Sequence, residues 1–174
     1  ILTQSPIWLS EDLGGTLSSD WADFDADGDM DLAMALTVGT SVYRNHGDRM
    51  ELYWQDQENH SLGVRWADID SDGNQELVTI GSIDGSEIGP NESLNQGQNL
   101  IYSYAPLATL TANRFQVTRQ FTSTFQLARL EMGDFTGDGY VDLVGGTNAI
   151  NPSCPVHLFV NDGQGNLHEG LCIS

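Results

Sequence analysis

The sequence of 174 residues contains no lysine, and all six of its basic residues are arginine. The absence of lysine excludes Schiff-base chemistry and a phosphate-binding lysine of the P-loop type. No apolar run reaches the roughly 18 residues that a membrane-spanning helix needs, so none is predicted. The four histidines lie singly, without a metal-ligand spacing such as H-x-x-x-H. The N-terminal residues show no basic or apolar stretch, so we expect a processed or fragment start rather than a signal peptide.

Positive charge is scarce, because 25 acidic residues face six basic ones and the formal net charge is −19. A protein of this charge is repelled by phosphate, which argues against binding to nucleic acid, heparin or an anionic membrane. Hydrophobic residues make up 39% of the chain and aromatic residues 9%, which argues against disorder. The length suits a single domain.

Nearly half of the acidic residues, 12 of 25, lie in three short segments of one pattern. Each segment reads D-x-[DT]-x-D-G-x-x-[DE], with side-chain oxygens at positions 1, 3, 5 and 9 and glycine at position 6. The alternation turns every second side chain toward one centre, and the glycine permits a sharp turn. The segments are residues 23–31, 68–76 and 134–142, called loop 1, loop 2 and loop 3 below.

A divalent cation in each loop explains three copies in one register better than solvated acidic turns do. Packing several carboxylates into one small loop without a cation is costly, because like charges repel. Ligands that are all oxygen select calcium over zinc, and the abundance of carboxylates disfavours a magnesium site that keeps its waters. The backbone carbonyl at position 7, contributed by Asp29, Asn74 or Tyr140, can complete the shell.

The loops are not EF-hands, because an EF-hand needs a bidentate glutamate at position 12 and flanking helices. Position 12 is Met34, Thr79 or Gly145, and the residues after each loop alternate between apolar and small or polar, as in a β-strand. The loops begin 45 and 66 residues apart, and a repeat of about 40–50 residues with four strands is typical of propeller blades. The expected strands are 17–22, 32–37, 41–45 and 49–54 in the first blade, 61–67, 77–82, 99–104 and 114–120 in the second, and 126–133, 143–147, 156–161 and 166–172 in the third.

The repeated loops and their flanking residues resemble the FG-GAP/VCBS repeat family, the calcium-loop β-propellers that include integrin α-subunit heads and many bacterial extracellular proteins. The resemblance covers nearly the whole chain except residues 83–98 and 105–113, although literal Phe-Gly and Gly-Ala-Pro elements are absent. It implies an all-β fold of blades with four antiparallel strands and one Ca2+ ion in each loop. The implied ligands are Asp23, Asp25, Asp27 and Asp31 in loop 1, Asp68, Asp70, Asp72 and Glu76 in loop 2, and Asp134, Thr136, Asp138 and Asp142 in loop 3. Loop 1 should bind most tightly and loop 3 most weakly, because affinity follows ligand charge.

Three blades are fewer than the roughly four to eight of a closed propeller, and the family usually has seven. We therefore expect residues 1–174 to be one propeller segment, with blades over 17–54, 61–120 and 126–172. It could belong to a larger, about seven-bladed parent, pair with copies of itself, or be completed by another chain. Residues 5–9 are expected to be the outer strand of a preceding blade, which favours the larger parent.

The expected function is a calcium-stabilised extracellular binding or adhesion module. The partner would be a protein or carbohydrate at the loop face opposite the calcium loops, formed by residues 82–98 and 145–155. No catalytic constellation is visible, so we expect no enzymatic activity. The alternatives are a self-assembling unit of a surface layer or filament, and the non-catalytic, substrate-binding part of a secreted hydrolase or lyase.

The two cysteines bear on the location of the protein. Cys154 and Cys172 flank an expected hairpin, and pairing of Asn161 with Asn166 would place them nearly opposite, within disulfide reach. Two free thiols in a cytosolic chain are the alternative. A disulfide and a calcium requirement would together favour an extracellular, cell-surface or periplasmic location.

Overall fold

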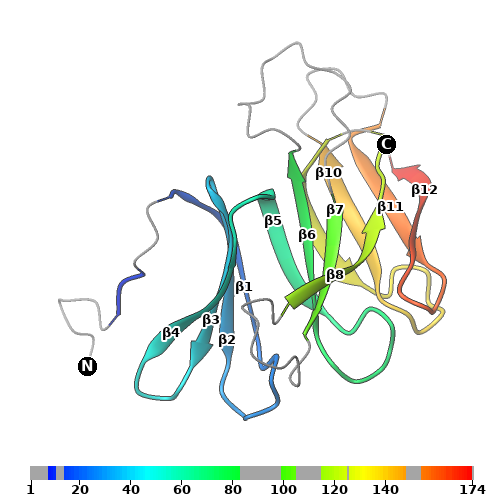
Figure 1. Ribbon diagram of the computed structural model, residues 1–174. Coiled ribbons are helices and arrows are strands. Elements are labelled where there is room, and N and C mark those ends of the chain that lie inside the picture. Colours follow the sequence, from blue (N-terminus) through cyan, green and yellow to red (C-terminus); the bar gives the residue numbers. More distant parts are fainter. Residues whose placement is uncertain are drawn as a thin grey trace, which may run out of the picture.

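Three four-stranded antiparallel sheets make up the computed structural model, which describes residues 8–10, 14–82, 99–104, 115–124, 126–147 and 154–173 (Figure 1). Those residues contain no helix, and hence none long and apolar enough to cross a membrane. The first sheet comprises β1 (Thr16–Ala22), β2 (Asp31–Leu36), β3 (Gly39–Asn45) and β4 (Met50–Asp56). The second comprises β5 (His60–Ala67), β6 (Glu76–Ser82), β7 (Asn99–Tyr104) and β8 (Phe115–Phe121). The third comprises β9 (Leu127–Gly133), β10 (Asp142–Thr147), β11 (Val156–Asn161) and β12 (Leu167–Ile173).

The sequence predicted the all-β class and all twelve strands to within two residues at either end. Strands pair in chain order within each sheet, because short connections favour neighbouring hairpins. The strand expected at residues 5–9 is not seen at Trp8 and Leu9, and residues 5–7 lie outside the described ranges. Trp8 packs its ring edge-on against Tyr43 of the first sheet, with centroids 4.9 Å apart.

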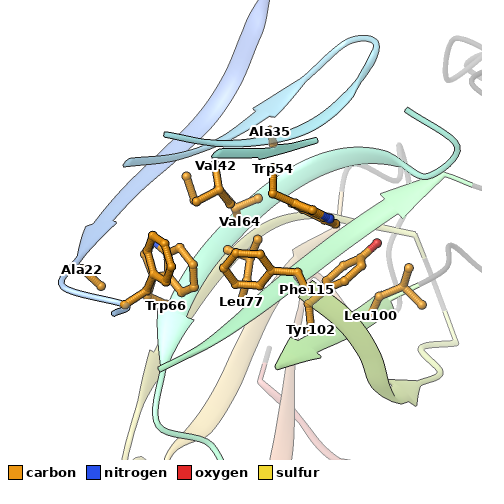
Figure 2. Close-up of a cluster of buried hydrophobic side chains, with 12 residues drawn as sticks. Ala22, Ala35, Val42, Trp54, Val64, Trp66, Leu77, Leu100, Tyr102 and Phe115 are labelled. Atoms are coloured by element: carbon orange, nitrogen blue, oxygen red, sulfur yellow. The ribbon is translucent and has the colours of Figure 1, made fainter. Parts of the chain in front are cut away.

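The junction between the first and second sheets is a mixed aliphatic and aromatic core (Figure 2). Val42 and Trp54 of the first sheet meet Trp66, Tyr102 and Phe115 of the second, all buried. The rings of Trp54 and Tyr102 lie 5.1 Å apart in an edge-to-face arrangement, a geometry that adds to the stabilisation from burial alone. This contact fixes the two sheets face to face.

The junction between the second and third sheets is aliphatic and closely packed. Its core includes Ile80 and Ile101 of the second sheet and Leu143 of the third. A Cβ atom at Gly63 would collide with the end of the Leu130 side chain, so a larger residue where β5 meets β9 would force Leu130 to move. Close packing at this point explains why the residue facing Leu130 carries no side chain.

Residues at equivalent positions of the three sheets form both junctions, and the copy that faces no neighbouring sheet is exposed. At position 2 of the loops, Phe24 stacks on Trp66 with centroids 5.6 Å apart, and Ile69 is fully buried. The third copy, Phe135, is 51% exposed. Likewise Trp66 is buried, whereas its counterpart Trp21 in the first sheet is 50% exposed. The outer faces of the first and third sheets therefore present residues of the type that fill the inner junctions.

A disulfide joins Cys154 to Cys172, whose Cα atoms lie 5.5 Å apart. The bond was anticipated, but the pairing used to anticipate it was wrong. Asn161 pairs with Leu167 rather than Asn166, and an irregularity in the β11–β12 pairing places His157 opposite Cys172. Cys154 precedes β11 and reaches its partner from beyond the end of the strand.

Candidate metal-binding loops

Each acidic loop connects the first two strands of its sheet, and the three lie along the lower side of the molecule in Figure 1. Their backbones follow the same path, because positions 4 and 6 both have a positive φ. Glycine fills position 6 in every loop, where a side chain would be strained. The φ angles are 58° at Ala26, 59° at Ser71 and 79° at Gly137 for position 4, and 96° at Gly28, 91° at Gly73 and 92° at Gly139 for position 6.

The aspartate at position 1 organises each loop by accepting two backbone N–H groups. Asp23 accepts the N–H of Asp27 on Oδ1 and that of Gly28 on Oδ2, each at 3.0 Å. Asp68 and Asp134 make the same pair of bonds in their loops. These bonds wrap the chain around the carboxylate, so the side chains at positions 3 and 5 turn to the same side as position 1.

The acid at position 9 is buried in all three loops and is bonded to the backbone at position 2. Asp31, Glu76 and Asp142 accept the N–H of Phe24, Ile69 and Phe135 at 3.3, 3.1 and 3.0 Å. Each bond links the end of its loop to the residue at position 2. That residue packs into a sheet junction in loops 1 and 2, and it lies on the outer face of the third sheet in loop 3.

Burial acts strongly on two of these carboxyl groups. It raises the pKa of Asp31 to about 6, with the backbone N–H of Asn45 opposing the shift. It raises the pKa of Glu76 to about 7, where the N–H of Ile69 opposes the shift and the charges of Asp70 and Asp72 add to it. A cation beside these groups would favour their ionised forms.

In loops 1 and 2, one carboxylate oxygen of the position-3 aspartate forms an ion pair with an arginine, and the other has no hydrogen-bond partner among the described residues. Asp25 has a side chain only 5% exposed, and its Oδ2 lies 2.7 Å from Arg44 Nε. Asp70 Oδ2 lies 3.0 Å from a terminal nitrogen of Arg119. Oδ1 of Asp25 and Oδ1 of Asp70 are buried and accept no hydrogen bond from any residue that the structure describes. Burial raises the pKa of Asp25 even though Arg44 opposes the shift.

The loops differ in which carboxylates they bring together. In loop 1, oxygens of Asp23, Asp25 and Asp27 lie within 4.8 Å of one another. In loop 2 the corresponding group is Asp68, Asp70 and Glu76. Loop 3, which is described in full, gathers no such group of three acids, since Thr136 stands at its position 3.

Not every expected ligand belongs to these groups: among the position-5 aspartates, Asp27 does and Asp72 does not. At position 5, Asp27, Asp72 and Asp138 each accept the backbone N–H of position 7 at 2.8–3.0 Å. This bond fixes Asp29, Asn74 and Tyr140 at the edge of their loops. Asp31 lies in the buried layer beneath loop 1 rather than in its group of three acids.

The residues present fit a hard divalent cation. The donors are carboxylate oxygens, with a hydroxyl at Thr136, and hard cations such as calcium prefer oxygen ligands. A buried polar atom without a partner is rare in folded proteins and needs an explanation. The unpartnered oxygens of Asp25 and Asp70 occur at the same position of loops 1 and 2. An ion bound in each loop would satisfy the oxygen of that loop.

Four residues that support the loops were missed from the sequence. Arg44 and Arg119 pair with loop acids from β3 and β8. Asn45 and Asn161 end the third strands of their sheets and donate their backbone N–H to Asp31 and Asp142 at 2.8 and 3.0 Å. The parallel between Arg-Asn-His-Gly at 44–47 and Val-Asn-Asp-Gly at 160–163 was a signal that could have identified the asparagines.

Comparison with known families agrees with the repeated architecture. Residues 23–79, which include loops 1 and 2 and the four strands β2 to β5 between them, match the family model described as an FG-GAP-like repeat. No curated protein matches the chain significantly. The match confirms, over residues 23–79, the resemblance to FG-GAP repeats inferred from the loop motifs.

Proposed function

We propose that this chain is a calcium-stabilised extracellular binding or adhesion module, built from propeller-like blades with one calcium ion in each acidic loop. The observation that carries the proposal is the buried carboxylate of Asp25. Its Oδ1 has no hydrogen-bond partner in the described part of the chain, and its side chain is grouped with those of Asp23 and Asp27. Loop 2 repeats the free oxygen at Asp70, so the feature belongs to the repeat rather than to one site.

Calcium would supply positive charge where the loops concentrate negative charge. Positions 1 and 5 present carboxylates that are already oriented by backbone N–H groups, so little loop order has to be gained on binding. A site filled at 100 times its dissociation constant adds about 2.7 kcal/mol to the free energy of unfolding. Three such sites would add a large share of the stability of a protein this size.

The exposed copies of the junction residues support completion of the array by further blades or by copies of the chain. Trp21 and Phe135 are half exposed, whereas Trp66 and Ile69 are buried at the inner junctions. A neighbouring sheet at either outer face would bury them in the same way. The same exposure favours the alternative of a self-assembling surface or filament unit, and a strictly monomeric chain in sedimentation experiments would argue against that alternative.

The ligand of the module is proposed to be a protein or a carbohydrate at the face opposite the loops. The segments expected to form that face, 82–98 and 145–155, lie largely outside the described residues. The disulfide between Cys154 and Cys172 supports an extracellular, cell-surface or periplasmic setting, because such bonds persist in oxidising compartments. The proposal assigns the chain no enzymatic activity, no nucleic-acid partner and no membrane span.

Thermal unfolding in EDTA, in millimolar calcium and in millimolar magnesium tests the proposal. We expect calcium to raise the melting temperature by many degrees and magnesium to raise it much less. Asp25→Asn should reduce the calcium-dependent rise. Asp48→Asn is the matched control, because Asp48 lies outside the loops with a side chain 81% exposed. A melting temperature that is the same in EDTA and in calcium would contradict the proposal.

A further inference from the structure

Two arginines reach into the acidic loops from strands that do not form those loops. Arg44 on β3 places Nε 2.7 Å from Asp25 Oδ2 and a terminal nitrogen 2.8 Å from Asp27 Oδ2. Arg119 on β8 places a terminal nitrogen 3.0 Å from Asp70 Oδ2. Both guanidinium groups are partly buried, with side chains 31% and 25% exposed. Ion pairs in such positions are screened less than pairs on an open surface.

The arginine and the aspartate at position 3 occur together or not at all. Loop 3 has Thr136 at position 3, and no ion pair to loop 3 occurs among the residues that the structure describes. Val160 takes the place of Arg44 there, since it follows Phe159 as Arg44 follows Tyr43, and both aromatic residues pair with the leucine after the loop. With one arginine each, loop 1 has five acids and a net charge of −4, and loop 2 has four acids and −3. Loop 3 has three acids and −3 without an arginine.

The two carboxylate oxygens of the position-3 aspartate have the same pair of environments in loops 1 and 2. Oδ2 faces the arginine, and Oδ1 is buried with no hydrogen-bond partner among the described residues. In loop 2 the guanidinium is also enclosed from the other side, because Gly165 of the β11–β12 turn lies so close that a Cβ there would be 3.0 Å from Arg119 Cζ. The Arg119 guanidinium therefore packs between Asp70 of loop 2 and the β11–β12 turn rather than lying on an open surface.

We propose that Arg44 and Arg119 are positioning residues and resident counter-cations of the calcium loops, each holding one oxygen of the position-3 aspartate and leaving the other for the ion. The inference rests on the proposed calcium binding. In the calcium-free protein the guanidinium offsets part of the repulsion among the acids. In the loaded protein the same charge opposes the incoming ion. Each arginine thus stabilises the empty loop and weakens its affinity for calcium.

The inference predicts two effects of opposite sign for one substitution. Arg44→Gln should lower the melting temperature of the full chain in EDTA, because loop 1 loses its counter-charge. It should also tighten one macroscopic calcium dissociation constant by on the order of tenfold, because a nearby like charge is removed. Arg119→Gln should do the same through loop 2. An arginine with a merely structural role would lower the melting temperature without tightening any constant.

The experiment combines melting in EDTA with calcium titration in competition with a chelator, on the full-length chain. Arg129→Gln is the matched control, since it changes the net charge equally while the guanidinium of Arg129 contacts its own strand, 2.6 Å from the carbonyl of Ala128. Arg44→Lys keeps the charge and should retain a dissociation constant near the wild-type value. It also tests the inference if Arg44→Gln fails to fold.

The outcomes separate this inference from the proposed function. A wild-type chain that binds no calcium refutes both. A wild-type chain that binds calcium, together with Arg44→Gln and Arg119→Gln variants whose constants are unchanged or weaker, refutes the inference and leaves the proposed function standing. A tightening equal to that of Arg129→Gln would assign the effect to overall charge and would also refute the inference.

Discussion

Asn161 connects loops 2 and 3, and its replacement by alanine should be among the most damaging single substitutions outside the apolar core. Its side-chain Nδ2 donates to the carbonyl of Ile69 in loop 2 at 2.7 Å and to that of Val141 in loop 3 at 2.9 Å. Its Oδ1 accepts the N–H groups of Gly163 and Gly165 at 3.0 and 3.2 Å. The residue itself is buried.

The expected magnitude follows from the number and burial of these bonds. Four side-chain hydrogen bonds at about 1 kcal/mol each, with buried partners left unpaired, give a loss of about 3–5 kcal/mol. Asn45 holds the same place in the first sheet but makes two such bonds, to Met30 and Gly47, in a more exposed setting. Its replacement by alanine should cost about 1–2 kcal/mol.

Urea unfolding of the two variants in EDTA, with the wild type as reference, measures the difference without any contribution from bound metal. Asn161→Asp is a third variant, which keeps an acceptor for the glycine N–H groups and loses both donors to the carbonyls. It should be less stable than Asn161→Ala, because a buried carboxylate would face two carbonyl oxygens without a donor between them. If Asn161→Ala costs no more than Asn45→Ala, the assignment of Asn161 as the link between the loops is wrong.

Three further predictions concern separate parts of the fold. Ala26→Gly should stabilise the protein by about 0.5–1 kcal/mol in urea unfolding, since alanine is strained at φ 58° and loop 3 already has glycine at this position; a loss would contradict this. Cys172→Ser should lower the free energy of unfolding by about 3 kcal/mol, because the disulfide closes a loop of 18 residues, and an unchanged denaturation midpoint would count against it. Burial opposes ionisation of Asp56, but hydrogen bonds from Asn59 and Tyr102 prevail and lower its pKa. Its ionised form therefore stabilises the fold above the unfolded pKa of about 3.9, and this contribution is lost as pH falls through the lower folded value. Asp56→Asn should thus destabilise the protein at pH 7, with a difference from the wild type that shrinks below about pH 4; a constant difference from pH 7 to pH 3 would refute this.

The strands and the loop backbone could be predicted because their causes are local. Alternation after each loop assigns side chains to the two faces of the strand: Ala33 and Ala35 enter one buried cluster, and Leu32 and Met34 enter another on the opposite face. A positive φ at position 6 favours glycine, so glycine at this position in all three copies of the pattern indicates one backbone path.

The side-chain partners could not be predicted because they depend on register and on packing between sheets. The β11–β12 register already differs by one residue at the turn, where Asn161 pairs with Leu167, and the irregularity between His157 and Phe159 shifts it again, so the assumed register was wrong although the disulfide forms. Arg119 reaches Asp70 across a separation of 49 residues, and nothing in the local pattern indicates that contact. The same holds for the bond from Asn161 to Ile69, which joins residues 92 positions apart.

Counting bound ions gives the most direct test of calcium in the acidic loops. The full chain, freed of metal with a chelator, is titrated with calcium and the stoichiometry is measured by calorimetry and by metal analysis after dialysis. The loops predict three calcium ions per chain, and a triple variant carrying Asp23→Asn, Asp68→Asn and Asp134→Asn should bind none. A wild-type chain that binds no calcium, or a triple variant that binds as much as the wild type, would contradict the prediction.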